Sequence, residues 1–262
     1  MTDSEDSLQS LQQMETPPIQ LLSPLATLAG VFYRPQRAFA SIAQRPSTWW
    51  IPFGFALIVF YLIFFGTIAR TDFQQMRQKA LQHTTKQTWQ FQNMPPAQMA
   101  MAERGFKRMQ QLGWLGGPLL ILLYFGMEAA ALLAVMHYGF HAQAKLRQVF
   151  AVAWYASLPG LFLMLPFALK PYLGGKIPTF WSFEWLSLGH YLHAGATLNP
   201  IYSIVGSFNV FDIWSILLAT IGLAVVTGSR RIHALVAPLV WWFVRWIAWF
   251  VLFGIVGMVM VV

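Results

Sequence analysis

The sequence predicts an all-α fold, a polytopic membrane helical bundle with about five transmembrane helices and additional interfacial amphipathic helices. Hydrophobic residues make up 57% of the chain and charged residues 10%, whereas about a quarter of the residues in an ordinary soluble domain are charged. The apolar residues also occur in blocks close to the roughly 20 residues that a helix needs to cross a bilayer. One helical membrane domain is therefore expected, rather than a soluble enzyme.

The N-terminal residues 1–20 are expected to form a disordered acidic tail. This stretch is polar, holds four of the nine Asp and Glu residues, and has no basic region before an apolar core, so it is unlike a cleavable signal peptide. The membrane domain is predicted to fill residues 21–262. Since the chain contains no cysteine, disulfides and Cys-based metal sites are excluded, and no cofactor is predicted.

Five membrane spans are predicted from the apolar blocks and the charges that bound them. The first block contains no charged residue, and the third contains Pro159 and Pro166, which are expected to kink it. The last span is the C-terminal part of an apolar stretch that is too long for one perpendicular crossing. The predicted spans are residues 51–69, 114–136, 150–169, 211–227 and 243–262.

Two long connections separate these spans. A basic polar loop is predicted at residues 70–113, where the Asn-Met-Pro-Pro sequence at 93–96 divides two expected helices. An aromatic loop rich in Gly and Pro is predicted at residues 170–209, with a short helix at 199–208. The basic loop fits a solvated face, or a surface for anionic lipid or a protein partner, and the sequence leaves both open.

A short amphipathic helix is expected before the first span. Pro35 suits the first turn of a helix, and the spacing of Phe39 and Ile42 places two apolar side chains on one face. We interpret this segment as an interfacial helix leading into the membrane, with Trp49 and Trp50 in the headgroup region.

The orientation in the membrane is not decided by charge. Five crossings would place the two ends of the chain on opposite sides. With the N-terminus inside, the inside segments carry seven Lys and Arg residues and the outside segments carry nine. The positive-inside rule does not separate these numbers, and it is weakest for long loops such as residues 70–113.

Three motifs in order resemble a known family. They are residues 31–42 (VFYRPQRAFASI) with Pro46 and the Trp pair, residues 154–159 (WYASLP), and residues 207–214 (SFNVFDIW) followed by Gly222. Together they resemble the bacterial branch of the Yip domain family, which is named for eukaryotic members that interact with Ypt/Rab GTPases. The resemblance covers roughly residues 25 to 260.

The resemblance implies a five-helix membrane domain with a cytoplasmic N-terminus, a C-terminus across the membrane and no known catalytic site. Its eukaryotic members act in vesicle trafficking and membrane shaping through partners. The sequence lacks their Asp-Leu-Tyr-Gly-Pro type motif near the first span, so GTPase binding is not carried over. For a bacterial member, the resemblance implies the inner membrane as the location.

Glu128, Asp212 and Arg245 are the candidate intramembrane functional or packing residues. A charge in the middle of a span costs roughly 2.5–3.5 kcal/mol, so Glu128 is expected to face the bundle as a proton or cation site or as a packing residue. Asp212 is expected to act as a carboxylate in the first turn of its helix. Both carboxylates are within reach of Arg245 inside the bundle, but we expect Arg245 to snorkel toward the interface.

Other motifs give weaker indications of a functional site. His137 with His141, and His190 with His193, have helical spacing, but no carboxylate pattern accompanies either pair, so no metal site is predicted. Gly113 and Gly117 favour close packing of a neighbouring helix. No nucleic-acid-binding pattern is present in the sequence.

The leading functional hypothesis is a non-enzymatic membrane protein that organises lipids or partner proteins. The expected partners are membrane lipids, including anionic ones, unknown proteins, or further copies of the chain. The alternative is a transporter or channel component that uses Glu128, although no internal repeat of the kind found in many transporters is visible. A membrane-embedded hydrolase is a third hypothesis, which requires a nucleophile and a base close together.

Overall fold

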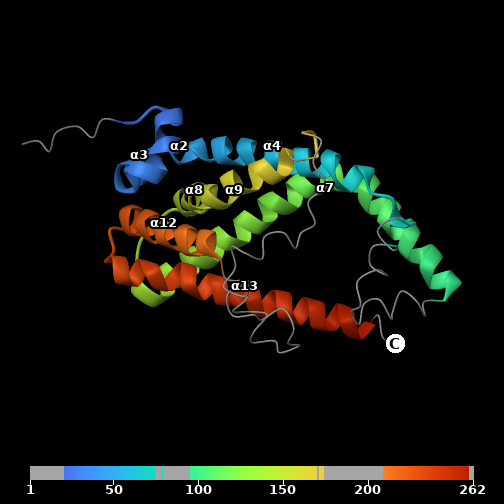
Figure 1. The fold of residues 1–262 in the computed structure, drawn as a ribbon. Helices are drawn as coiled ribbons and strands as arrows, with labels where there is room; N and C mark the ends of the chain where they lie inside the picture. Colours follow the sequence, from blue (N-terminus) through green and yellow to red (C-terminus); the bar gives the residue numbers. More distant parts are fainter. Residues whose placement is uncertain (1–20, 75–77, 79–94, 170, 174–208, 260–262) are drawn as a thin grey trace, which may run out of the picture.

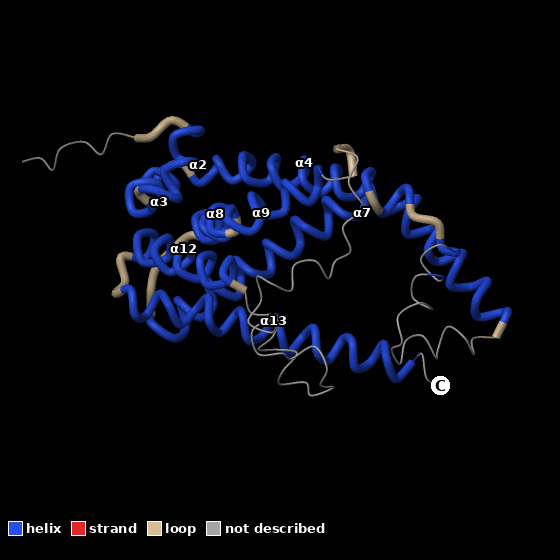
Figure 2. The backbone as a smooth tube through the Cα atoms, in the orientation of Figure 1, coloured by secondary structure: helices blue, strands red, loops and turns tan. Residues whose placement is uncertain are grey.

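The computed structural model describes residues 21–74, 78, 95–169, 171–173 and 209–259. Every element in this part of the chain is a helix (Figure 2), which confirms the all-α prediction. The elements are α2 (Pro24–Tyr33), α3 (Pro35–Gln44), η1 (Pro46–Trp49), α4 (Trp50–Gly66), η2 (Ile68–Arg70), α7 (Pro96–Ala134), η3 (Val135–Gly139), α8 (Leu146–Ala156), α9 (Leu158–Leu169), α12 (Val210–Thr227) and α13 (Arg231–Val259).

Several predicted features lie outside the described residues. They are the acidic tail at 1–20, residues 79–94 of the basic loop, and residues 174–208 of the aromatic loop, with its expected helix at 199–208 and both His190 and His193.

Three helical segments among the described residues are long and apolar enough to cross a membrane, namely Pro46–Arg70, Pro96–Gly139 and Val210–Thr227. They contain the first, second and fourth predicted spans. The third predicted span consists of two shorter helices, α8 and α9, which are interrupted at Ser157. Residues 243–259 of the fifth fall within α13, and its last three residues lie outside the described residues. The bundle is thus confirmed as a membrane-type helical fold, and the number of five crossings stays a prediction.

The break between α8 and α9 has a local cause. Pro159 is the second residue of α9, and proline lacks the N–H that would continue the hydrogen bonding of the preceding turn. The expected kink in the third span is therefore present at this proline.

Helix α3 has the expected start and apolar face, but a different neighbour. It begins at Pro35, and both Phe39 and Ile42 are fully buried. These side chains pack on α8 and α12 rather than on lipid. Close approach is possible because Gly222 of α12 has no side chain, and a Cβ there would lie 2.9 Å from the Phe39 ring. Protein therefore covers the apolar face of this helix, and its position in the membrane interface stays a prediction.

The two tryptophans before the first span differ in environment. Trp50 is 62% exposed, which is compatible with a position among lipid headgroups. Trp49 instead contacts Phe150 of α8 edge-on, with ring centroids 5.1 Å apart. The predicted tryptophan pair thus has one outward and one inward member.

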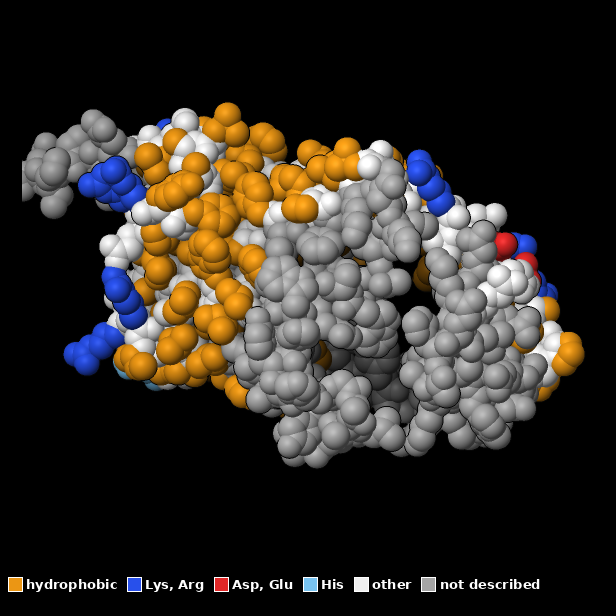
Figure 3. Space-filling view, viewed as in Figure 1, with side chains coloured by type: hydrophobic (Ala, Val, Ile, Leu, Met, Phe, Trp, Pro, Cys, Tyr) orange, Lys and Arg blue, Asp and Glu red, His pale blue; other side chains and the backbone are white. Residues whose placement is uncertain are grey.

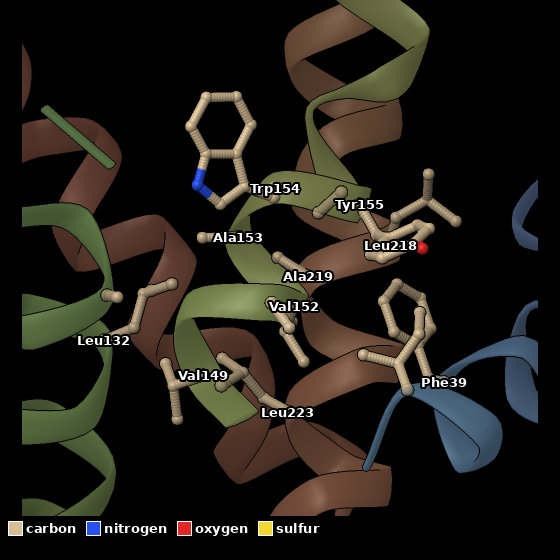
Figure 4. Close-up of a cluster of buried hydrophobic side chains, with 14 of the residues drawn as sticks. Phe39, Leu132, Val149, Val152, Ala153, Trp154, Tyr155, Leu218, Ala219 and Leu223 are labelled. Atoms are coloured by element: carbon tan, nitrogen blue, oxygen red, sulfur yellow. The ribbon is translucent and has the colours of Figure 1, made fainter. Parts of the chain in front are cut away.

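Helix α8 forms the centre of the bundle and lies between α4 and α7 in Figure 1. Seven of its 11 residues are buried, and Trp154 stacks on Phe125 of α7 with ring centroids 3.8 Å apart. Figure 4 shows side chains of α8 meeting Leu132 of α7, Leu223 of α12 and Phe39 of α3. This core aligns the helices that surround the candidate site.

Helix α7 is continuous across the predicted boundary between loop and span. It contains 39 residues, about 58 Å of helix, whereas the hydrocarbon core is about 30 Å thick. The helix expected after residues 93–96 is present, but it continues into the second span without interruption. Gln110 attaches it to the segment after α4 by donating hydrogen bonds to the carbonyls of Ile68 and Thr71 at 2.7 and 2.8 Å.

The small residues of α7 admit side chains from α4. A Cβ on Gly113 would lie 2.8 Å from the Phe64 ring, and one on Gly117 would overlap the Phe60 ring. The predicted packing role of Gly113 and Gly117 is therefore confirmed.

Pro118 interrupts the hydrogen bonding of α7 one residue later. Because proline has no N–H, it leaves the carbonyl of Trp114 without its usual partner four residues ahead. The hydroxyl of Tyr61 on α4 donates to this carbonyl at 3.1 Å. An unpaired carbonyl at this depth would be costly, since lipid offers no hydrogen-bond donor.

This pairing predicts a dependence between two positions. Tyr61→Phe should destabilise the protein by about 1–2 kcal/mol, because the Trp114 carbonyl loses its donor. In a Pro118→Ala background the restored N–H of residue 118 takes the carbonyl, so Tyr61→Phe should have little further effect. Thermal unfolding of the four proteins in one detergent measures the coupling. Equal losses in both backgrounds would show that the hydroxyl does not serve this carbonyl.

Candidate functional site

A cavity of about 110 Å³ lies between α7, α8, α12 and α13. Helices α7, α12 and α13 supply its polar side chains, and α8 supplies small residues such as Ala153 and Ala156. The polar and aromatic groups that line it include Tyr124, Glu128, Asp212, Ser215, Trp241 and Arg245. All three candidate residues predicted from the sequence therefore border one space.

Asp212 occupies the first turn of α12, as predicted. Asn209 precedes the helix and accepts hydrogen bonds from the N–H groups of Phe211 and Asp212, each at 2.9 Å. Asp212 Oδ2 in return accepts from the N–H of Asn209 at 3.2 Å. This reciprocal capping box satisfies backbone donors that a helix start leaves free. The predicted place of Asp212 in the first turn is confirmed, and the capping box fixes its carboxylate at the cavity.

Arg245 faces into the bundle. Its Nη2 lies 3.2 Å from Asp212 Oδ1, and its Nη1 donates to the Tyr124 hydroxyl at 3.3 Å. The Arg245 side chain is 26% exposed and that of Asp212 19%. The expectation that Arg245 snorkels toward the interface is therefore corrected. A partner carboxylate inside the bundle offers the charge-assisted hydrogen bond that the guanidinium would otherwise seek in water.

Glu128 lies one helical turn after Tyr124 on the same face of α7. It is attracted electrostatically by Arg245, and its carboxyl group faces the indole of Trp241. The Trp241 Nε1 atom is buried without a hydrogen bond of ordinary geometry. If both carboxyls are ionised, Glu128 and Asp212 outnumber Arg245 by one charge, so the cluster favours a proton or a small cation.

The sequence itself indicates that Asp212 and Arg245 can pair. The two residues stand at similar distances from the Thr227–Arg231 turn: Asp212 is 15 residues before Thr227, and Arg245 is 14 residues after Arg231. In an antiparallel helical hairpin this spacing places them at about the same height. The contributions of Tyr124 and Trp241 were missed, although each precedes a charged candidate by four residues.

None of the histidines among the described residues lines this cavity. His137 belongs to η3 and His141 follows it, at a positive φ of 52°. Within the described residues, no group of three or more His, Cys, Asp and Glu side chains is arranged to hold a metal ion.

Comparison with known proteins bears on the chain as a whole. The family model described as the Yip1 domain matches residues 29–253. The match extends over most of the chain and includes every residue that lines the cavity. No curated protein and no solved structure matches the chain.

The charge pair predicts a non-additive mutant cycle. Asp212→Asn keeps an acceptor for the capping box but removes the ion pair of Arg245, so it should cost about 3 kcal/mol of stability. Arg245→Met should also destabilise, because it leaves Asp212 unpaired. The double variant removes both charges and should recover much of the loss. The stability of the natural chain and the three variants is measured by thermal unfolding in detergent. Strictly additive losses would show that Asp212 and Arg245 do not stabilise each other.

Proposed function

The chain belongs to the Yip1 domain family, and from that membership we propose a non-enzymatic multi-pass membrane protein that organises lipids or partner proteins in its membrane. The observation that carries the proposal is the distribution of charge. Arg245, inside the bundle, is matched by Asp212 and Tyr124, whereas the cations at one end of the bundle lie in turns that contain no acidic residue.

These turns meet at the end of the molecule formed by α3 and the α12–α13 connection, where Lys and Arg side chains gather (Figure 3, left). No Asp or Glu occurs between residues 33 and 50, 139 and 148, or 227 and 233. Basic residues beside a bilayer attract anionic headgroups, at about 1 kcal/mol each. The basic residues of these turns and of the helix starts beside them are Arg34, Arg37, Arg45, Lys145, Arg147, Arg230 and Arg231.

Exposed apolar residues on α7 support the same proposal. Leu112, Leu115, Leu119 and Leu123 are each more than half exposed. In a bilayer such a surface faces lipid tails or another membrane helix, and both are contacts that an organising protein uses.

A second candidate function is favoured by the cavity. Glu128 borders it beside Trp241, and the cluster holds two carboxyls for one guanidinium. A carboxyl group in such a position is the usual element of a proton or cation pathway. Transport through the bundle by way of Glu128 is therefore the alternative to the organising function.

The two functions predict different results in reconstituted vesicles. The organising function predicts no proton or cation flux above that of empty vesicles, for the natural chain and for Glu128→Gln alike. Glu103→Gln is the matched control, because Glu103 is a partly exposed carboxyl of the same helix, outside the cavity, that pairs with Lys107. A clear flux in the natural chain and the control that disappears in Glu128→Gln would replace the organising function by transport.

We place the protein in a bacterial inner membrane, with its N-terminus in the cytoplasm, from the resemblance of its three motifs to bacterial family members. With five crossings, the C-terminus then lies on the opposite side. Alkaline phosphatase fused after residue 262 is therefore expected to be active, since that enzyme works only outside the cytoplasm. An inactive fusion of normal abundance would reverse the orientation or change the number of crossings.

A further inference from the structure

A groove of about 500 Å³ opens at the basic end of the bundle, separate from the cavity that contains Glu128. It lies where the start of α3 meets α12 and the start of α13. Its lining consists of Arg34, Pro35, Gln36, Arg37, Ile221 and Arg231. Three of the six lining residues are arginines, and they come from two helices that are far apart in the sequence.

The three guanidinium groups are available for a ligand. Arg34, Arg37 and Arg231 are exposed, and none of them forms an ion pair or a side-chain hydrogen bond with another described residue. Three cations around one groove repel each other, and an anion between them removes that repulsion. The planar guanidinium also matches a phosphate group with two parallel hydrogen bonds.

The backbone around the groove also favours an anion. Helix α3 has 10 residues and begins at Pro35, and α13 begins at Arg231. The first N–H groups of a helix have no partner within the helix, and the helix dipole makes this end positive. Both helix starts therefore add to the attraction of the three arginines for a phosphate.

The depth of the groove favours a lipid phosphate over a soluble one. Ile221 lies six residues before Thr227, the end of α12, and thus about 9 Å below that end. The groove combines a charged rim at the end of the bundle with an apolar wall further into the apolar part of α12. A phospholipid has the same order of groups, a phosphate above and acyl chains below.

We propose that this groove binds the phosphate of an anionic phospholipid, held by Arg34, Arg37 and Arg231, with the start of an acyl chain against Ile221. The proposal rests on the organising function above and names the lipid class and the site. An anionic headgroup is preferred because a zwitterionic one carries a choline or ethanolamine cation that the three arginines repel.

The test compares two triple variants of the full chain in neutral detergent. The first is Arg34→Gln, Arg37→Gln and Arg231→Gln. The matched control is Arg45→Gln, Lys145→Gln and Arg147→Gln, which removes the same charge from the same end but leaves the groove intact. Native mass spectrometry measures binding of phosphatidylglycerol and of phosphatidylcholine with the same acyl chains.

The natural chain should prefer phosphatidylglycerol, and the groove variant should lose about tenfold or more of its affinity for that lipid relative to the control, whose three cations lie at the same end but do not line the groove. An equal loss in the control would show that overall surface charge attracts the lipid, and would overturn the site. A triple Arg→Lys variant, which keeps the charge but not the paired hydrogen bonds, should be intermediate. It decides the question if the Gln variant does not fold.

Inorganic phosphate separates the two sources of the anion. It should displace phosphatidylglycerol only in large excess, since it cannot use the apolar wall. Displacement at equal concentration would show a site for a soluble anion and would overturn the lipid assignment.

The same preparations separate the site from the proposed function. Absence of lipid preference in the natural chain, with a protein partner still co-purifying from native membranes, would refute the groove and leave the organising function standing. Absence of both a preferred lipid and a partner would refute the two together.

Discussion

Polar groups in the bundle have to find partners within the protein, because the surrounding hydrocarbon supplies none. Pro118 leaves the Trp114 carbonyl without an N–H donor, and the Tyr61 hydroxyl of another helix donates a hydrogen bond to it. The Arg245 guanidinium forms an ion pair with Asp212 and a hydrogen bond with Tyr124, and these residues lie on two other helices. Each of these bonds joins separate helices, so the need for hydrogen-bond partners also specifies which helices lie side by side.

The packing of the bundle follows a second rule, in which small residues face large rings. The ring of Phe60 packs against Gly117, and the ring of Phe39 packs against Gly222. Lipid tails are as apolar as these side chains, so the gain comes from close contact between helices rather than from removing apolar surface from water. Helix α8 is central for this reason: it places Val152 against Gly222 and Trp154 against Phe125.

Local sequence patterns predicted where the helices lie in the chain better than they predicted which helices pack against each other. The uncharged block at 51–69 and the carboxylate of Asp212 in the first turn of α12 are features of one stretch of sequence, and both were found in the predicted place. The apolar face of Phe39 and Ile42 was also found, but a periodic pattern shows only that a face is apolar. It does not show whether lipid or α12 covers that face. The continuity of α7 was missed because polarity changes near residue 113, whereas the backbone hydrogen bonds of a helix can continue from a polar into an apolar stretch.

The candidate site shows the same division. Glu128, Asp212 and Arg245 stood out because charged residues are rare in apolar spans. The meeting of Asp212 and Arg245 depends on the antiparallel course of α12 and α13, which the short turn between them already implies, whereas the approach of Glu128 depends on the packing of α7. Tyr124 and Trp241 gave no such signal, since aromatic residues are abundant throughout this chain.

The proline within α7 also has a mechanical consequence. Residues 96–117 form an arm of about 33 Å, and Pro118 is a pivot between this arm and the part of the helix that carries Glu128. A rotation of about 10° at the pivot would move the tip of the arm by about 6 Å. Contacts of the arm with α4 and the segment after it resist that swing, since Tyr61 donates to the Trp114 carbonyl and Gln110 donates to the carbonyls of Ile68 and Thr71.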